Sequence, residues 1–169
     1  MTDPDPGVPS PGQTRTGAGD TARHRPDDGN IYLTLHRIIA APVETVYAAW
    51  TDPDLLRQWL APGDTAVARA IAETTIGGTF LVEMRGTDGK TWLTRGTYRE
   101  VVPNRRLVHT WRWEGSDVES LVTVELEPES DGATRLTLTH SRFSQAEARD
   151  EHVRGWTGCL AKLEALYAG

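Results

Sequence analysis

The sequence predicts one α+β domain in which a curved, seven-stranded antiparallel sheet packs around a long C-terminal helix. Residues 31–142 consist mainly of segments with alternating apolar and polar residues, which is the pattern of half-buried strands. Residues 144–167 are the only run long enough for a helix of about five turns or more. Two short helical segments follow directly after the first strand, so the helices of this chain lie at its two ends.

The C-terminal segment has the pattern of an amphipathic helix. Ser144 and Glu147 have the spacing of a capping box, which predicts the start of the helix at this point. A single helix with one apolar face needs a sheet to cover, and the strands before it supply one. The apolar residues recur at steps of three and four and share one face: Val153, Trp156, Leu160, Leu163 and Tyr167.

The remaining elements follow in a regular order. The first strand is expected at residues 31–39, and Pro42 and Pro53 suit the first turns of the two short helices. Because each later strand is a sequence neighbour of the next, an antiparallel meander is the simplest topology. The later strands are expected at residues 65–73 (an edge strand), 79–85, 91–101, 106–114, 118–127 and 134–142.

Composition divides the 169-residue chain into two parts. Residues 1–29 hold five of the ten prolines and five of the sixteen glycines, with no aromatic residue and no Ile or Leu. Such a segment buries too little apolar area to offset its ordering entropy, so we expect a disordered tail. Residues 30–169 are the expected folded domain.

Charge and cysteine content exclude several classes of function. The formal net charge of -6 argues against a nucleic-acid partner. No apolar run is long enough to span a bilayer or to form a signal peptide, so we expect a cytoplasmic protein without a membrane partner. The lone Cys159 excludes an internal disulfide, and we expect neither a metal site nor a cofactor. Arg far outnumbers Lys, as in GC-rich bacterial genes, and a homodimer is compatible with the sequence.

The folded part resembles a known family. The matching features are the run RIIAAPVETVYAAWTDPDLLRQWLAPG, Gly77-Gly78 before Thr79-Phe80, Gly96-Thr97-Tyr98 leading to Val102–Leu107, Thr134–His140, and Gly155-Trp156. In this order and spacing they are similar to the activator of heat-shock protein ATPase homologue family, within the START-like (SRPBCC, Bet v 1-like) superfamily. The resemblance covers residues 31–168 and implies the helix-grip fold, in which a curved sheet surrounds a C-terminal helix.

The same resemblance implies a hydrophobic cavity between sheet and helix. Large aromatic side chains around such a cavity suit a flat, apolar ligand. A close-packed, tryptophan-rich core without a cavity is the alternative. The expected ligand-binding residues are Trp50, Trp59, Phe80, Met84, Trp92, Tyr98, His109, Trp111, Trp113, His140, Trp156 and Cys159.

Two histidines are the candidate polar contacts. His109 and His140 are expected to point inward from strands that flank a common neighbour, and His152 lies where the helix would reach the cavity mouth. A buried imidazole can orient a ligand or act as a general base, but taken alone each histidine is better interpreted as a hydrogen-bonded core residue. No spacing marks a catalytic triad or a phosphate loop, so we assign no catalytic residue.

Three functions are therefore open. The first is binding of a small hydrophobic or aromatic molecule in the cavity, without catalysis. The second is a cyclase or hydrolase that uses His109 or His140 in the same cavity. The third is an interaction module in stress response or chaperone regulation. The chaperone activators of this family carry a separate N-terminal domain, and the short tail here argues against a chaperone partner.

Overall fold

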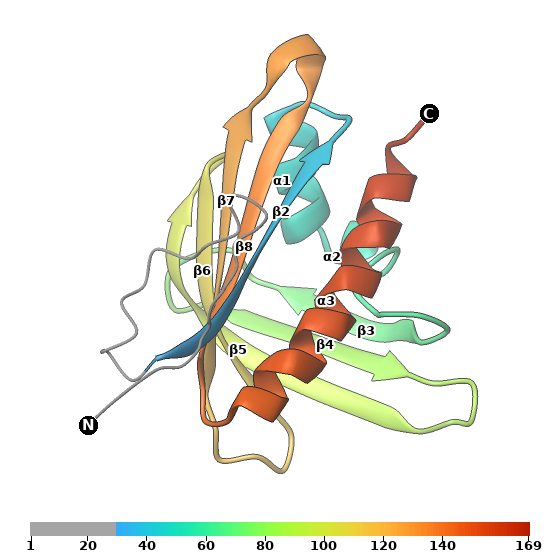
Figure 1. Cartoon of the computed structure of the whole chain (residues 1–169), viewed down its shortest axis with the longest axis vertical. Coiled ribbons are helices and arrows are strands. Elements are labelled where there is room, and N and C mark those ends of the chain that lie inside the picture. Colours follow the sequence, from blue (N-terminus) through green and yellow to red (C-terminus); the bar gives the residue numbers. More distant parts are fainter. Residues whose placement is uncertain (1–29) are drawn as a thin grey trace.

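The computed structural model describes residues 30–169 and contains one seven-stranded sheet with three α-helices (Figure 1). The predicted tail lies outside the described residues. The elements are β2 (Ile31–Ile39), α1 (Val43–Thr51), α2 (Pro53–Leu56), β3 (Ala66–Ala72), β4 (Thr79–Arg85), β5 (Thr91–Val102), β6 (Arg106–Trp113), β7 (Ser120–Pro128), the 3-10 turn η2 (Ser130–Gly132), β8 (Thr134–Phe143) and α3 (Ala146–Leu166).

The sheet is antiparallel throughout, with the strand order β2-β8-β7-β6-β5-β4-β3. Strands β3 to β8 form the expected meander, and β3 is the expected edge strand. The first strand does not continue this meander, because β2 pairs with β8 at the other edge of the sheet. The chain crosses from one edge to the other through α1 and α2, which is why the two short helices close one end of the sheet (Figure 1).

Helix α3 lies across the open side of the curved sheet (Figure 1), and the helix-grip architecture is confirmed. The predicted capping box is wrong. Helix α3 begins at Ala146, and its N-cap is Gln145, in extended backbone and without a side-chain capping bond. Ser144 therefore stands one position outside the cap, where its hydroxyl is out of register with the free backbone N–H groups.

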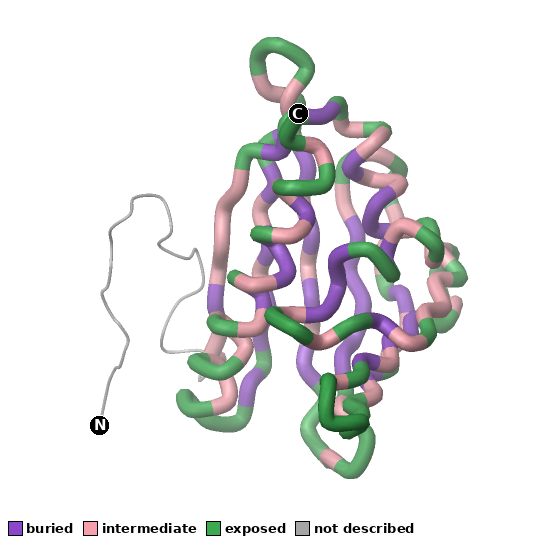
Figure 2. The backbone as a smooth tube through the Cα atoms, turned by 90° about the vertical axis from the view of Figure 1, so that its right-hand side faces the viewer, coloured by how far each residue is buried: buried purple, intermediate pink, exposed green. Residues whose placement is uncertain are grey.

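The two halves of α3 are attached differently. Cys159, Leu160 and Leu163 in the C-terminal half are buried, and Lys162 Nζ donates hydrogen bonds to the carbonyls of Ala61 (2.5 Å) and Thr65 (3.2 Å). In the N-terminal half no side chain before Trp156 is fully buried. The burial pattern along the backbone is visible in Figure 2. Apolar packing therefore anchors the second half of the helix more firmly than the first.

Two glycines separate these halves. A Cβ atom on Gly158 would lie 3.1 Å from Pro62 Cβ, so this glycine lets the loop after α2 approach the helix closely. A Cβ atom on Gly155 would meet nothing within 4 Å. A close approach is thus found at Gly158 alone, and Gly155 locally lowers helix propensity without a packing reason.

Candidate ligand-binding interior

The predicted residues come together on the inner face of the sheet and the facing side of the helices. Most are buried, and Trp113 is half-buried. The buried members are Trp50, Trp59, Phe80, Met84, Tyr98, His109, Trp111, His140, Trp156 and Cys159.

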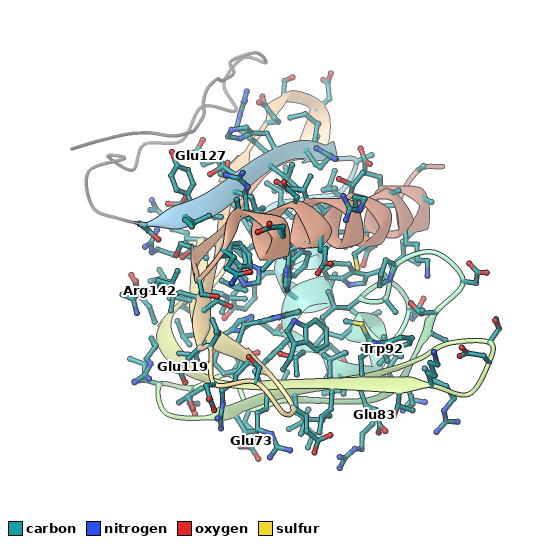
Figure 3. All side chains as sticks on the ribbon, turned by 60° about the horizontal axis from the view of Figure 1, so that its bottom comes forward. Glu73, Glu83, Trp92, Glu119, Glu127 and Arg142 are labelled. Carbon is teal, nitrogen blue, oxygen red and sulfur yellow. The ribbon has the colours of Figure 1, made fainter. Side chains whose placement is uncertain are left out.

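Trp92 differs from this group, because 43% of its surface is exposed. It pairs with buried Met84 of β4, but the β5–β6 ladder begins only at Thr94 and Trp113. Trp92 therefore lies beyond the end of β6, on the helix side of the sheet, whereas Glu73 and Glu83 point away from the helix (Figure 3). It lies at the open end of the inner face, and its expected contact with a ligand stays a prediction.

Aromatic rings fill the space between the sheet and α3. The ring centroid of Trp156 lies 6.0 Å from that of Trp50 and 5.3 Å from that of Trp111, and Phe80 stacks on His109 at 4.0 Å. Two hollows of about 200 and 250 Å³ lie outside this cluster of rings, and both are lined by Arg95 and Arg112. A ligand between sheet and helix would therefore have to displace these rings or α3.

His140 lies at the centre of a directional chain of hydrogen bonds. Trp156 Nε1–H donates to His140 Nδ1 at 3.0 Å, and Ser120 Oγ lies 2.7 Å from His140 Nε2. Ser120 uses its own proton to donate to the Trp111 carbonyl at 3.0 Å. His140 must therefore carry its proton on Nε2 and donate it to Ser120. Both ring nitrogens are occupied, which favours a structural role over general-base catalysis.

His152 makes a similar arrangement in the opposite direction. Trp113 Nε1–H of β6 donates to His152 Nε2 at 2.9 Å, and His152 Nδ1 donates to the Ala148 carbonyl at 2.7 Å. A tryptophan of α3 thus donates its indole N–H to a histidine of the sheet, and a tryptophan of the sheet donates its indole N–H to a histidine of α3. Each bond requires a neutral imidazole as acceptor.

His109 keeps one nitrogen free among the described residues. Its Nδ1 donates to the Thr110 carbonyl at 2.9 Å, and no side chain or backbone group of residues 30–169 bonds Nε2. In register, His109 pairs with Val122 and Val122 pairs with His140, which confirms the expected common neighbour of the two histidines.

Burial sets the protonation states of these histidines. It lowers the pKa of His109 to about 4, against a smaller opposing effect of the Thr110 carbonyl. Burial also lowers the pKa of His140 far below its ordinary value, helped by His152 and His109, and lowers that of His152. All three imidazoles are neutral at pH 7. Burial likewise raises the pKa of Cys159 to about 12, so its thiol is protonated and unreactive.

Three buried polar atoms have no hydrogen-bond partner among residues 30–169: Trp50 Nε1, Trp111 Nε1 and the Tyr98 hydroxyl. The Thr74 hydroxyl is near enough to Tyr98 to oppose slightly the burial that raises the Tyr98 pKa to about 12. The two indoles can only donate, and neither N–H has an acceptor among residues 30–169. By contrast, Trp59 Nε1 donates to the Ala49 carbonyl at 3.0 Å. Trp50 and Trp111 therefore present two unmatched donors beside Trp156.

The prediction from sequence missed Ser120 and Phe143. Ser120 lies two residues before Val122 on the same strand, so alternation predicts that its side chain points inward. The sequence does not indicate which groups its hydroxyl bonds. Phe143 is out of phase with His140, because the β2–β8 register shifts between Ile31 and Leu33 and Arg142 adopts a positive φ of 69°. Such a bulge reverses the alternation and leaves no clear signal in the sequence.

Within the described part of the chain, no three His, Cys, Asp or Glu side chains are grouped so that they could hold a metal ion. None of the helices in residues 30–169 is long and apolar enough to cross a membrane.

Comparison with known proteins agrees with this architecture. Among curated proteins none matches the chain. A structure from Chromobacterium violaceum is 29% identical with a TM-score of 0.74, covering 82% of this chain and 97% of that one. The structure of an AHSA1 protein from Silicibacter pomeroyi is 30% identical with a TM-score of 0.74, covering 82% and 98%. The family model described as "Activator of Hsp90 ATPase homolog 1-like protein" matches residues 40–168. The chain therefore belongs to the family of Activator of Hsp90 ATPase homolog 1-like proteins.

Proposed function

We propose that this protein binds a small, mainly aromatic molecule that carries a hydrogen-bond acceptor, between the sheet and α3. The observation that carries the proposal is the pair of buried indole donors, Trp50 Nε1 and Trp111 Nε1, without acceptors among the described residues. Leaving a buried donor unpaired costs about 1–3 kcal/mol. A carbonyl, carboxylate or ether oxygen of a ligand that accepts from either donor recovers that cost.

The surroundings of these donors favour an aromatic body for the ligand. Both indoles flank Trp156, and Phe80 and His109 add further ring faces next to Trp111. Rings of this kind favour flat, apolar molecules through stacked and edge contacts. The space is occupied in this closed arrangement, so binding includes a movement of rings or of α3.

A second candidate is acid–base catalysis by His109 in the same interior. It is supported by the Nε2 lone pair, which has no partner among residues 30–169, and by the fixed proton on Nδ1. A pKa of about 4 makes this imidazole a weak base at pH 7, where an efficient general base has a pKa nearer to the working pH. Binding is therefore the better-supported function.

An interaction module is the least supported of the three functions. The most exposed large apolar residues include Ile76 at 73% and Ile38 at 51%. Ile38 is on β2 and Ile76 is in the turn between β3 and β4, at opposite edges of the sheet. Such separated residues do not form the contiguous apolar patch of a docking site.

The indole N–H signals of the tryptophans provide a direct test by proton–nitrogen NMR. Titration with 2-naphthoate, compared with its acceptor-free analogue 2-methylnaphthalene, probes the need for an acceptor. We expect the Trp50 and Trp111 indole signals to shift with the carboxylate ligand, and the variants Trp50→Phe and Trp111→Phe to bind about tenfold more weakly per lost hydrogen bond.

Trp59→Phe is the matched control, because it removes an indole N–H that already has an acceptor. It should lower stability while leaving the preference for 2-naphthoate over 2-methylnaphthalene unchanged. Native mass spectrometry of gently purified protein should show a co-purifying aromatic molecule. Equal affinity of both naphthalenes for all four proteins would contradict the proposal.

A further inference from the structure

Residues 146–154, here called the lid segment, form the N-terminal part of α3, which packs less deeply than the rest of the helix. None of its side chains is fully buried, although Ala148 and Val153 pack against the core. Within residues 30–169, one side-chain hydrogen bond joins the lid segment to the sheet, from Trp113 Nε1 to His152 Nε2, whereas the bond from Trp156 to His140 lies beyond Gly155. The polar attachment of the lid segment therefore depends on the His152 imidazole acting as an acceptor.

The other half of α3 has no such dependence. Cys159, Leu160 and Leu163 are buried, and Lys162 is bonded to two backbone carbonyls beyond α2. Between the two halves lies Gly155, whose missing side chain serves no close approach. Glycine inside a helix weakens it relative to alanine, so the helix is easiest to bend or unwind at this junction.

We propose that the lid segment is an acid-released lid over the aromatic interior, hinged at Gly155 and held closed by the hydrogen bond from the Trp113 indole to the His152 imidazole. A protonated imidazole has N–H groups at both nitrogens. Protonation of His152 would therefore place two N–H groups head to head at Trp113. The bond is then replaced by a donor–donor repulsion, and the lid segment separates from the sheet.

The neighbouring groups fit this mechanism. Burial disfavours a charged His152, whereas its hydrogen bond to the Ala148 carbonyl and the charge of Glu151 favour it. Glu151 lies on the exposed side of the lid segment beside His152. The charges of His152 and of His109 from β6 both disfavour a charge on His140. Opening of the lid segment relieves the burial of His152.

The difference in histidine pKa between the open and closed states determines how strongly the opening equilibrium depends on pH. In the open state a solvated His152 has a pKa of about 6.5, whereas in the closed state burial holds its pKa lower. The closed state is therefore favoured above pH 6.5, and opening increases as pH falls below it. From pH 7.5 to 5.0 the opening equilibrium should rise by at most about 30-fold, the limit in which His152 titrates only in the open state.

Hydrogen–deuterium exchange of the ligand-free full chain tests this proposal. After correction for intrinsic exchange rates, we expect peptides from residues 146–154 to lose protection between pH 7.5 and 5.0, while residues 159–166 stay protected. Because no ligand is present, the outcome is independent of whether the proposed aromatic ligand exists.

Three variants complete the design. His152→Gln keeps an acceptor and a donor that do not titrate, so it should reduce the pH dependence of the lid segment. Gly155→Ala should reduce opening about fivefold at every pH by stiffening the hinge. His36→Gln, in the histidine of β2 that is bonded to Thr137 on the neighbouring strand, is the matched control and should behave like the wild type.

Any of three results would overturn the proposal. Protection of residues 146–154 could be independent of pH in the wild type. It could be lost together with that of residues 159–166, which would indicate global unfolding. Finally, residues 146–154 of His152→Gln could lose protection with falling pH as strongly as those of the wild type and of the His36→Gln control.

Discussion

The Trp156 indole of α3 donates a 3.0 Å hydrogen bond to Nδ1 of His140 in β8, so a helix residue fixes the tautomer of a sheet histidine. The proton on the opposite nitrogen is then passed to Ser120, whose hydroxyl donates to the Trp111 carbonyl. Helix α3 is thereby joined to three neighbouring strands of the sheet by one continuous chain of donors and acceptors.

This chain predicts different tautomers for the interior histidines. His140 should carry its proton on Nε2, whereas His109 and His152 should carry it on Nδ1, because their Nδ1 atoms face the carbonyls of Thr110 and Ala148. Nitrogen chemical shifts of the imidazole rings at pH 7.5 distinguish the two forms. The same tautomer at all three histidines would contradict the hydrogen-bond directions described above.

Removal of the Ser120 hydroxyl should destabilise the fold. In Ser120→Ala the His140 Nε2–H loses its acceptor and the Trp111 carbonyl loses a donor, at an expected cost of about 1–3 kcal/mol. Urea denaturation gives the free energy of unfolding. Ser116→Ala is the control, since the Ser116 hydroxyl accepts from Val118 N–H in an exposed turn and its loss should cost less than about 0.5 kcal/mol.

His109 should make stability fall in acid. Its folded-state pKa of about 4 lies below the unfolded value of about 6.5, so the unfolded chain binds the extra proton between these values. Stability is therefore complete above about pH 6.5 and is lost as the pH falls towards 4, by about 2–3 kcal/mol between pH 7.5 and 4.5. His109→Phe should reduce the measured pH dependence by this amount, and a variant with the full wild-type slope would exclude His109 as its source.

The two helix glycines should respond oppositely to alanine. Gly155→Ala should raise the free energy of unfolding by about 0.5–1 kcal/mol, because the helix gains propensity and the new methyl group meets nothing. In Gly158→Ala the methyl group would lie 3.1 Å from Pro62 Cβ, so the gain should be cancelled or reversed. Thermal and urea unfolding give the free energy of unfolding of both variants. An equal increase in both would show that the loop after α2 moves away from the new methyl group at little cost.

Cys159 should be unreactive in the folded protein. Its side chain is 2% exposed, so a reagent has little access to the sulfur. Burial raises the pKa of the thiol to about 12, so almost none of the reactive thiolate is present. Labelling by a thiol reagent at pH 8 should therefore require unfolding, and its rate should rise with urea in parallel with loss of structure. Rapid labelling of the folded chain would show that the C-terminal half of α3 leaves the sheet.

Most of the strand positions could be predicted because alternation is a local property of the chain. The first strand was placed at its observed bounds, and the later strands within one or two residues of theirs. The inward direction of His109 and His140 followed from the same alternation. The exposure of Trp92 did not, because it depends on where the neighbouring strand β6 ends.

The sequence by itself determined the elements, their order and the inner face, because periodicity and turn residues act over a few positions. The tertiary structure alone decided that β2 pairs with β8, that Phe143 turns inward after a bulge, and which nitrogen of each histidine accepts an indole N–H. These features depend on atoms far apart in the chain. Only folding brings Trp113 to His152 and Ser120 to His140, and so turns separate polar residues into one network.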